Sequence, residues 1–296
     1  MAFVPGGSFL MGSNDHYPEE RPARSSTVDA FLMDRTPVTN AQFARFVAAT
    51  GHVTFAEIAP DPRDYPGMDP ALAVPGSIVF VPPSHPVRLA DGPNWWRFVT
   101  GADWRHPSGP GSSIDMIPDH PVVHIGYTDA LAYAAWVGKQ LPTEAEWERA
   151  ARGGLEGAAY AWGDDFMPGG TRMTKTWEGH FPHDNRAAAG LERTAPVASY
   201  PANGFGLFDM IGNVWEWTDE AVAARGESGC CAGLPAAAQG GPQERVLKGG
   251  SHMCAPEYCQ RYRPAARWLQ PIDTTTSHVG FRCIRRLDLE RGKENI

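Results

Sequence analysis

Long apolar runs and blocks of like charge are both missing from this chain. No stretch of eighteen apolar residues occurs, which argues against a membrane-spanning helix, and no five or six like charges stand together. A protein that binds duplex nucleic acid carries a basic stripe, so we expect neither a nucleic-acid nor a membrane partner. Residues 1–7 also lack the basic and apolar regions of a signal peptide, and we expect a cytoplasmic protein.

Cysteine is scarce and odd in number, with five in 296 residues. That count argues against the dense disulfide framework of small secreted domains. In a reducing cytoplasm, neighbouring cysteines are better explained as metal ligands or redox groups than as structural bridges. The 26 basic and 34 acidic residues give a net charge of −8, which favours solubility and, weakly, a basic partner.

Glycine and proline are abundant instead, with 32 and 27 residues spread along the whole chain. This pattern predicts a folded protein rich in turns and ordered loops. Capping boxes of Thr39 with Gln42 and of Thr143 with Glu146 predict two helices, and Thr128 begins a third. Residues 60–120 are expected to wrap the surface, and short strands are predicted at Val122–Ile125, Val246–Leu247 and Gly280–Ile284.

These features together predict a single α+β domain of low regular secondary structure. The domain spans residues 1–286 and is followed by a charged tail, residues 287–296. We find no clean internal repeat, so a repeat architecture is not expected. Long loops need something to hold them in place, and bound metal ions are one candidate.

Two cysteines stand five positions apart, Cys254 and Cys259, with Pro256 between them. Their thiols can converge across a tight turn. Two thiolates are too few for a structural zinc site, whereas soft sulfur ligands select Cu(I). Such a site leaves a coordination position for a third thiolate, from a substrate cysteine. Spacing alone also allows two buried thiols or a reducible disulfide.

The other three cysteines carry weaker signals. Cys230 and Cys231 are adjacent in a loop rich in glycine and alanine. Vicinal cysteines rarely converge on one metal, so we interpret them as exposed thiols or a labile redox pair. Cys283 follows Gly280-Phe281-Arg282 in a predicted strand and is expected to be a small core residue.

Flanking motifs give the cysteine pair its context. The chain resembles the formylglycine-generating enzymes, also called sulfatase-modifying factors, over nearly its full length. Most of the motifs also mark a wider superfamily, and the cysteine pair within Gly249–Arg263 singles out the formylglycine enzymes. The resemblance implies a C-type-lectin-like, sulfatase-modifying-factor fold. The matching segments are Pro5–Gly12, Pro37–Phe43, His120–His124, Leu141–Glu148, Asn203–Leu207, Gly212–Trp217, Gly249–Arg263 and Gly280–Cys283.

The resemblance implies a copper-dependent oxidase. Such an enzyme converts the cysteine of a sulfatase C-x-P-x-R sequence to Cα-formylglycine, using O2 and a thiol reductant. Its partner would be an unfolded sulfatase polypeptide or a peptide with that motif. Carried over to this chain, Cys254 and Cys259 would bind Cu(I), and Ser251 would lie near the copper and the oxygen site. Tyr258 would line the substrate groove, and Trp215 would pack beneath the site.

Two positions depart from the family pattern. Ala255 stands where the family often has His, and His278 stands where Asn commonly precedes the Gly-Phe-Arg-Cys segment. Both are expected to touch the substrate or its solvent shell. They affect the predicted substrate preference and leave the predicted reaction unchanged.

Family members carry two structural calcium ions, and the resemblance implies one here. Its ligands would be the carboxylates of Asp209 and Glu216 and the backbone carbonyls of Gly212 and Val214. The side-chain ligands of the second ion are replaced by Lys175 and Ala189. We predict that the Lys175 ammonium takes the place of that cation by donating hydrogen bonds to loop carbonyls. In the alternative, Lys175 points to solvent.

Two other classes of function remain open. An ergothioneine-type sulfoxide synthase would need a histidine-rich iron site with spacing such as H-x3-H-x-E, which we do not find in the sequence. A non-catalytic lectin-like binding module would leave the cysteine pair idle. Copper dependence and the oxidation of a peptide cysteine separate these classes.

Overall fold

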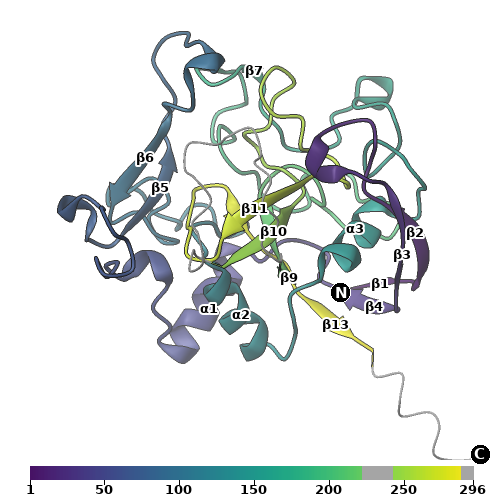
Figure 1. The fold of residues 1–296 in the computed structure, drawn as a ribbon, viewed down its shortest axis with the longest axis horizontal. Helices are drawn as coiled ribbons and strands as arrows, with labels where there is room; N and C mark the ends of the chain where they lie inside the picture. The colour runs from purple at the N-terminus through teal and green to yellow at the C-terminus, as the bar shows by residue number, and fades with distance from the viewer. Residues whose placement is uncertain (222–242, 288–296) are drawn as a thin grey trace, which may run out of the picture.

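The computed structural model describes residues 1–221 and 243–287 (Figure 1). Cys230, Cys231 and residues 288–296 lie outside these ranges. The described part is one body of short elements joined by long ordered loops, as predicted for an α+β domain of low regular structure. None of its helices is long and apolar enough to cross a membrane.

The three α-helices of the described ranges begin at local capping signals. In α1 (Asn40–Thr50) and α3 (Glu144–Arg152), both predicted capping boxes form, and glycines with positive φ end the helices. Helix α2 (Tyr127–Trp136) begins one residue before the predicted Thr128. The reason is that the Asp129 carboxylate accepts a hydrogen bond from Gly126 N at 2.9 Å, so Gly126 is the cap.

A four-stranded sheet lies at the centre of the molecule, in the order β11-β10-β9-β12 (Figure 1). Strand β10 pairs antiparallel with both β11 and β9, whereas β12 runs parallel to β9. The predicted strand at Val246–Leu247 is confirmed within β10. The bounds are β9 Trp215–Ala221, β10 Glu244–Lys248, β11 Arg267–Pro271 and β12 Val279–Gly280.

Smaller sheets and single turns of 3-10 helix surround this centre. One sheet has the order β1-β4-β13, and the remaining pairs are β2-β3, β5-β6 and β7-β8. The strands are β1 Ala2–Val4, β2 Gly7–Met11, β3 Arg24–Val28, β4 Phe31–Met33, β5 Gly76–Phe80, β6 Trp96–Thr100, β7 Gly179–His180, β8 Asp184–Asn185 and β13 Ile284–Arg286. The 3-10 turns are η1 Pro18–Glu20, η2 Phe55–Glu57, η3 Pro70–Leu72, η4 Leu89–Asp91 and η5 Pro168–Gly170.

Two predicted strands and one predicted surface segment need correction. Val122–Ile125 is not a strand, because His124 adopts a φ of 61°, a conformation that breaks an extended chain. The predicted strand Gly280–Ile284 is divided between β12 and β13, which belong to different sheets. Residues 60–120 do more than wrap the surface, since they form the β5-β6 hairpin and bury Trp95 and Trp104.

The apolar interior consists of three clusters. The main cluster packs α1 and α2 against β9, β10 and β12, and it contains Cys283, which confirms that cysteine as a core residue. A second cluster joins α3 to the N-terminal strands. The third is an aromatic cluster, which we define by Phe80, Trp95, Trp177 and Phe181, and it includes Met253 and Ala255 of the cysteine loop.

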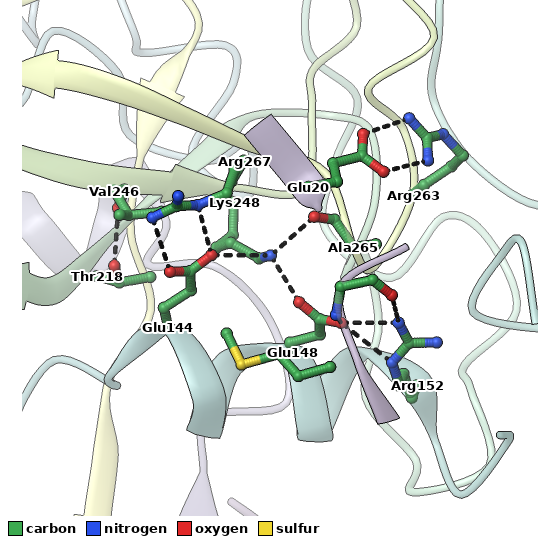
Figure 2. A network of polar contacts seen from close by, with 12 residues as sticks. Glu20, Glu144, Glu148, Arg152, Thr218, Val246, Lys248, Arg263, Ala265 and Arg267 are labelled. Carbon is green, nitrogen blue, oxygen red and sulfur yellow. Dashed lines mark hydrogen bonds and ion pairs between the residues drawn. The ribbon is translucent and has the colours of Figure 1, made fainter. Parts of the chain in front are cut away.

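A network of buried charges ties α3 to the central sheet (Figure 2). Lys248 of β10 is fully buried, and its Nζ lies 2.9 Å from Glu148 Oε2 and 3.5 Å from Glu144 Oε1. Arg152 pairs with Glu148 at 2.7 Å, and Arg267 pairs with Glu144 at 2.8 Å. Burial raises the pKa of Glu148, but the nearby Lys248 and Arg152 outweigh it and hold the pKa below its usual value.

Candidate functional site

The cysteine loop, residues 249–263, folds back on itself at its first residues. Gly249 and Gly250 both have positive φ, 96° and 72°. A Cβ on Gly250 would lie 2.6 Å from the carbonyl oxygen of Arg261, so only glycine fits where the two ends of the loop meet. This close approach places the residues after Cys259 next to those before Cys254.

The predicted cysteine pair comes together in this loop. The sulfur atoms of Cys254 and Cys259 are 3.4 Å apart, far longer than the disulfide bond length of about 2.05 Å. Both are therefore free thiols in the structure. Cys254 is buried and Cys259 is partly exposed. The pair thus presents two soft donors, one of which a substrate can approach.

A short turn holds the two sulfurs in place. The backbone N–H of Ser251 donates to Cys254 Sγ at 3.4 Å, and the hydroxyl oxygen of Ser251 accepts from Met253 N at 3.2 Å. Cys259 N donates to the carbonyl of Ala255 at 2.8 Å. Ser251 therefore lies beside the sulfur pair, where the resemblance places it.

The two thiols share one proton unequally. The pKa of Cys254 is raised, first by its hydrogen bond to Cys259 and then by burial. The hydrogen bond from Cys254 lowers the pKa of Cys259 to about 6, against the effect of burial, and Arg261 lowers it further. Near neutral pH, Cys259 is accordingly a thiolate that accepts a hydrogen bond from the Cys254 thiol.

An ion-pair clamp fastens the N-terminal turn η1 to the cysteine loop. The Arg261 guanidinium donates to Glu19 Oε1 through Nε at 2.9 Å, and its Nη1 lies 3.9 Å from Cys259 Sγ. Two residues later, Arg263 binds both carboxylate oxygens of Glu20, at 2.7 and 2.5 Å. The sequence did not predict the Arg261–Glu19 contact, because the two residues lie 242 positions apart.

Aromatic side chains form one wall beside the pair. Tyr258 is partly exposed and stacks on Phe181, with ring centroids 4.3 Å apart, while the Trp95 ring meets it edge-on. Ala255 is fully buried against the same aromatic cluster. The expected contact of Ala255 with the substrate or its solvent shell is therefore corrected, because this side chain has no exposed surface.

His278 and Trp215 lie together and are joined through their backbones. The backbone N–H of Trp215 donates to the carbonyl of His278 at 2.9 Å, and Trp215 packs into the main core. The His278 ring is partly exposed and lies tilted by 39° against Trp96, with ring centroids 4.9 Å apart, and it bonds Thr276 Oγ1 at 2.7 Å. Burial lowers the pKa of His278 to about 3, so the ring is neutral near pH 7.

The predicted calcium loop is built from unusual backbone conformations. Asp209, Gly212 and Asn213 all have positive φ. A Cβ on Gly212 would lie 2.5 Å from the Lys175 carbonyl, so this turn needs glycine. Asp209 is buried, and burial raises the pKa of its carboxyl to about 6. Hydrogen bonds among the described residues do not reach the carbonyl oxygens of Gly212 or Val214.

Glu216 makes contacts that the sequence did not predict. Its carboxylate is fully buried, accepts from Arg282 Nε at 2.8 Å and Nη2 at 2.8 Å, and accepts from Trp147 Nε1 at 2.8 Å. The other predicted ligands fit a hard cation: a buried carboxylate and carbonyls left without donors. Glu216 would have to bridge such a cation and Arg282.

Lys175 is buried, with 1% of its surface exposed, so the alternative that it points to solvent is excluded. The predicted donation to loop carbonyls is wrong, however. The Lys175 ammonium lies 3.4 Å from Glu178 Oε1, and Arg172 contacts the other oxygen of that carboxylate. A carboxylate three residues along the chain, and not a loop carbonyl, accepts the hydrogen bond of this ammonium and supplies its counter-charge.

Within residues 1–221 and 243–287, three or more His, Cys, Asp or Glu side chains nowhere gather in a group placed to hold a metal ion. The cysteine pair is thus a two-donor site, and a calcium ion at the predicted loop would need the backbone carbonyls of Gly212 and Val214 beside the carboxylates of Asp209 and Glu216. Two soft sulfurs at 3.4 Å match the coordination preference of Cu(I) better than that of a hard cation.

Known proteins similar to this chain cover it almost completely. The family model for the sulfatase-modifying factor enzyme 1-like domain matches residues 1–287. The formylglycine-generating enzyme of Mycobacterium tuberculosis is 55% identical, over 95% of this chain and 96% of the relative. The enzyme of that name from Bos taurus is 41% identical, over 96% of this chain and 74% of the relative.

Two further similarities bear on the fold and on activity. The solved structure of PvdO from Pseudomonas aeruginosa has a TM-score of 0.63 and 23% identity, over 96% of this chain and 93% of that one. This likeness confirms the predicted fold. The inactive C-alpha-formylglycine-generating enzyme 2 of Mus musculus is 36% identical, over 96% of this chain and 84% of the relative.

Proposed function

Since this chain belongs to the family of sulfatase-modifying factor enzyme 1-like domains, we propose that it is a copper-dependent formylglycine-generating oxidase. Its substrate would be the cysteine of a C-x-P-x-R sequence in an unfolded sulfatase or a peptide, with O2 and a thiol reductant as co-substrates. The observation that supports this proposal most strongly is the free Cys254–Cys259 pair, whose sulfurs are 3.4 Å apart.

The overall reaction balances with these reactants. The substrate –CH2–SH group becomes an aldehyde, which removes two electrons from carbon, and the sulfur leaves as hydrogen sulfide. O2 takes four electrons and becomes one oxygen of the aldehyde and one molecule of water. The thiol reductant supplies the other two electrons and two protons as it becomes a disulfide.

Different residues of the site would bind the metal, orient its ligands and admit the substrate. Cys254 and Cys259 would hold Cu(I), and a bound Cu(I) ion would supply the one-electron donor that O2 needs. The backbone N–H of Ser251 orients Cys254 Sγ, and the hydrogen bond between the thiols keeps Cys259 deprotonated. Cys259 is partly exposed, so a substrate thiolate can approach it beside the Tyr258 ring.

His278 and Trp215 are assigned the role of shaping the surface on which the substrate binds. His278 is neutral and partly exposed, next to Trp96, and can offer only uncharged contacts to a peptide. Trp215 lies behind it in the core and fixes its backbone. These two residues are proposed as substrate-positioning groups and have no part in electron transfer.

One calcium ion is proposed at Asp209, with the carbonyls of Gly212 and Val214 and one oxygen of Glu216. This proposal is supported by a buried carboxylate beside two carbonyls that accept no hydrogen bond from the described residues. At the second position, Lys175 is proposed as the resident cation, paired with Glu178. The cytoplasmic location expected from the sequence stays a prediction.

A peptide assay tests the proposed function. Protein loaded with one equivalent of Cu(I), given a C-x-P-x-R peptide, O2 and dithiothreitol, is expected to form a hydrazide-reactive aldehyde. Metal-free protein is expected to form none. A non-catalytic binding module, which the inactive relative makes the main alternative, would bind the peptide without forming aldehyde.

A further inference from the structure

A guanidinium group is held against the partly exposed sulfur of the cysteine pair. Arg261 Nη1 lies 3.9 Å from Cys259 Sγ, and its Nε and Nη2 donate to Glu19 Oε1 at 2.9 and 2.5 Å. Only 7% of the surface of Arg261 is exposed. Water therefore screens its charge from the sulfur less than it would at the surface.

Aromatic rings fix the orientation of this guanidinium. It lies 3.9 Å from the centroid of the Tyr17 ring and 4.9 Å from that of Trp268. The Tyr17 hydroxyl in turn accepts from Gln260 N at 3.0 Å. With Glu19 on one edge and two rings around it, Arg261 has little freedom to turn away from the sulfur.

A copper-loaded cysteine pair would carry a charge that the Arg261–Cys259 contact can compensate. Two thiolates and one Cu(I) carry one net negative charge. Burying that charge is costly unless a cation compensates it. Among the described residues, Arg261 is the cation that contacts a sulfur of the pair. The argument rests on the proposed function, because it presumes Cu(I) at this site.

We infer that Arg261 is a positioning residue of the copper site and the fixed counter-cation of the copper–dithiolate charge. Glu19 partly neutralises the Arg261 charge and so weakens its effect on the copper site. The two residues then have opposite effects. Removing the Arg261 charge weakens Cu(I) binding. Removing the Glu19 charge leaves the Arg261 charge less neutralised and strengthens Cu(I) binding.

A purely structural role would give a different pattern. Arg261–Glu19 and Arg263–Glu20 both dock the turn η1 onto the cysteine loop. If docking alone mattered, loss of either partner of either pair would weaken the site in the same direction. Arg263 is the matched control, because it lies in the same loop with the same kind of partner and contacts Gln260 O where Arg261 contacts sulfur.

The test is the Cu(I) dissociation constant, measured without O2 by competition with a chromophoric Cu(I) chelator. Arg261→Met is expected to weaken binding by about tenfold to a hundredfold, and Arg261→Lys by no more than about threefold. Glu19→Gln, which keeps the hydrogen-bond acceptor, is expected to bind Cu(I) about threefold to tenfold more tightly than wild type. Arg263→Met is expected to keep the wild-type constant.

Several results would overturn the inference. They are a wild-type constant for Arg261→Met, binding in Glu19→Gln that is no tighter than wild type, or an equal loss in Arg263→Met. Glu19→Gln decides the matter even if Arg261→Met fails to fold. Failure of the wild-type protein to bind Cu(I) would instead refute the proposed function and the inference together.

Discussion

Cys254 and Cys259 differ in their surroundings although one loop carries both. Cys254 is buried behind the backbone of Ser251, whereas Cys259 is partly exposed and faces Arg261. The sequence could predict the pair because its members are close together in a recognisable motif. It could not predict Arg261–Glu19, since no local pattern links residues 242 positions apart.

His124 provides a test of buried charge at the scale of one residue. The ring is fully buried, its Nε2 donates to the Pro107 carbonyl at 3.0 Å, and its Nδ1 bonds Ser77 Oγ at 2.7 Å. Burial lowers the pKa of His124 to about 4. The unfolded chain therefore binds one more proton than the folded protein between pH 6.5 and 4, and stability falls as the pH falls through that window.

His124→Asn is expected to remove about 1.4 kcal/mol per pH unit from the slope of stability against pH between 6 and 4.5. Asparagine tolerates the φ of 61° at this position, so the backbone can be kept. Urea unfolding at several pH values measures the slope. An unchanged slope would mean that His124 titrates in the folded protein.

The stability of a Lys175 variant tests whether the Lys175 ammonium takes the place of the second calcium ion. If it does, Lys175→Met should lower stability by about 2 kcal/mol, because the partly exposed Glu178 carboxylate loses its charge-assisted contact with the buried ammonium. Glu178→Gln serves as the control, since it removes the counter-charge and keeps the lysine. A rise in melting temperature for Lys175→Met would contradict the proposal, because it would show that burying the ammonium costs more than its contact contributes.

At the scale of elements, helix boundaries followed local chemistry, whereas only one of the three predicted strands, Val246–Leu247, formed as a single strand. The capping boxes of α1 and α3 lie within four residues of sequence, and both form as predicted. The strand expected at Val122–Ile125 was lost because tertiary bonds prevailed over propensity. His124 N donates to Thr276 O, and Val122 N donates to Val38 O.

Helix α3 is joined to β10 through a buried lysine, which gives a sharp test of the network in Figure 2. Lys248→Met leaves Glu148 with Arg152 and the Gly12 N–H, and we expect a loss of about 3–5 kcal/mol in chemical unfolding. Glu148→Leu removes the carboxylate that Lys248, Arg152 and the Gly12 N–H share, and is expected to cost more than Lys248→Met. If Glu148→Leu is the less destabilising of the two, the buried charge network is not the cause of the loss.

At the scale of the molecule, one domain with long loops was predictable from the spread of glycine and proline. The contacts that hold those loops in place could not be predicted. Residues 60–120 contribute Trp95 to the aromatic cluster beside the cysteine loop, and η1 is clamped to that loop from the other end of the chain. Such contacts depend on the three-dimensional path of the chain and leave no periodic signal.

Calcium removal tests how far loop order depends on the proposed ion. A ligand present at 100 times its dissociation constant stabilises by about 2.7 kcal/mol, so chelation with EGTA is expected to lower the melting temperature by about 5 °C. Added calcium should restore it. Asp209→Asn is expected to weaken this response, and equal melting curves with and without EGTA would argue against an ion at Asp209.

The central claim is that both cysteines hold the copper that drives oxidation of a substrate cysteine. The most direct measurement compares aldehyde formation from a C-x-P-x-R peptide by wild-type protein and by Cys259→Ser, each supplied with Cu(I), O2 and dithiothreitol. We expect steady turnover by the wild type and none above background by the variant, because one thiolate cannot hold a two-sulfur site. Wild-type rates in Cys259→Ser would contradict the account.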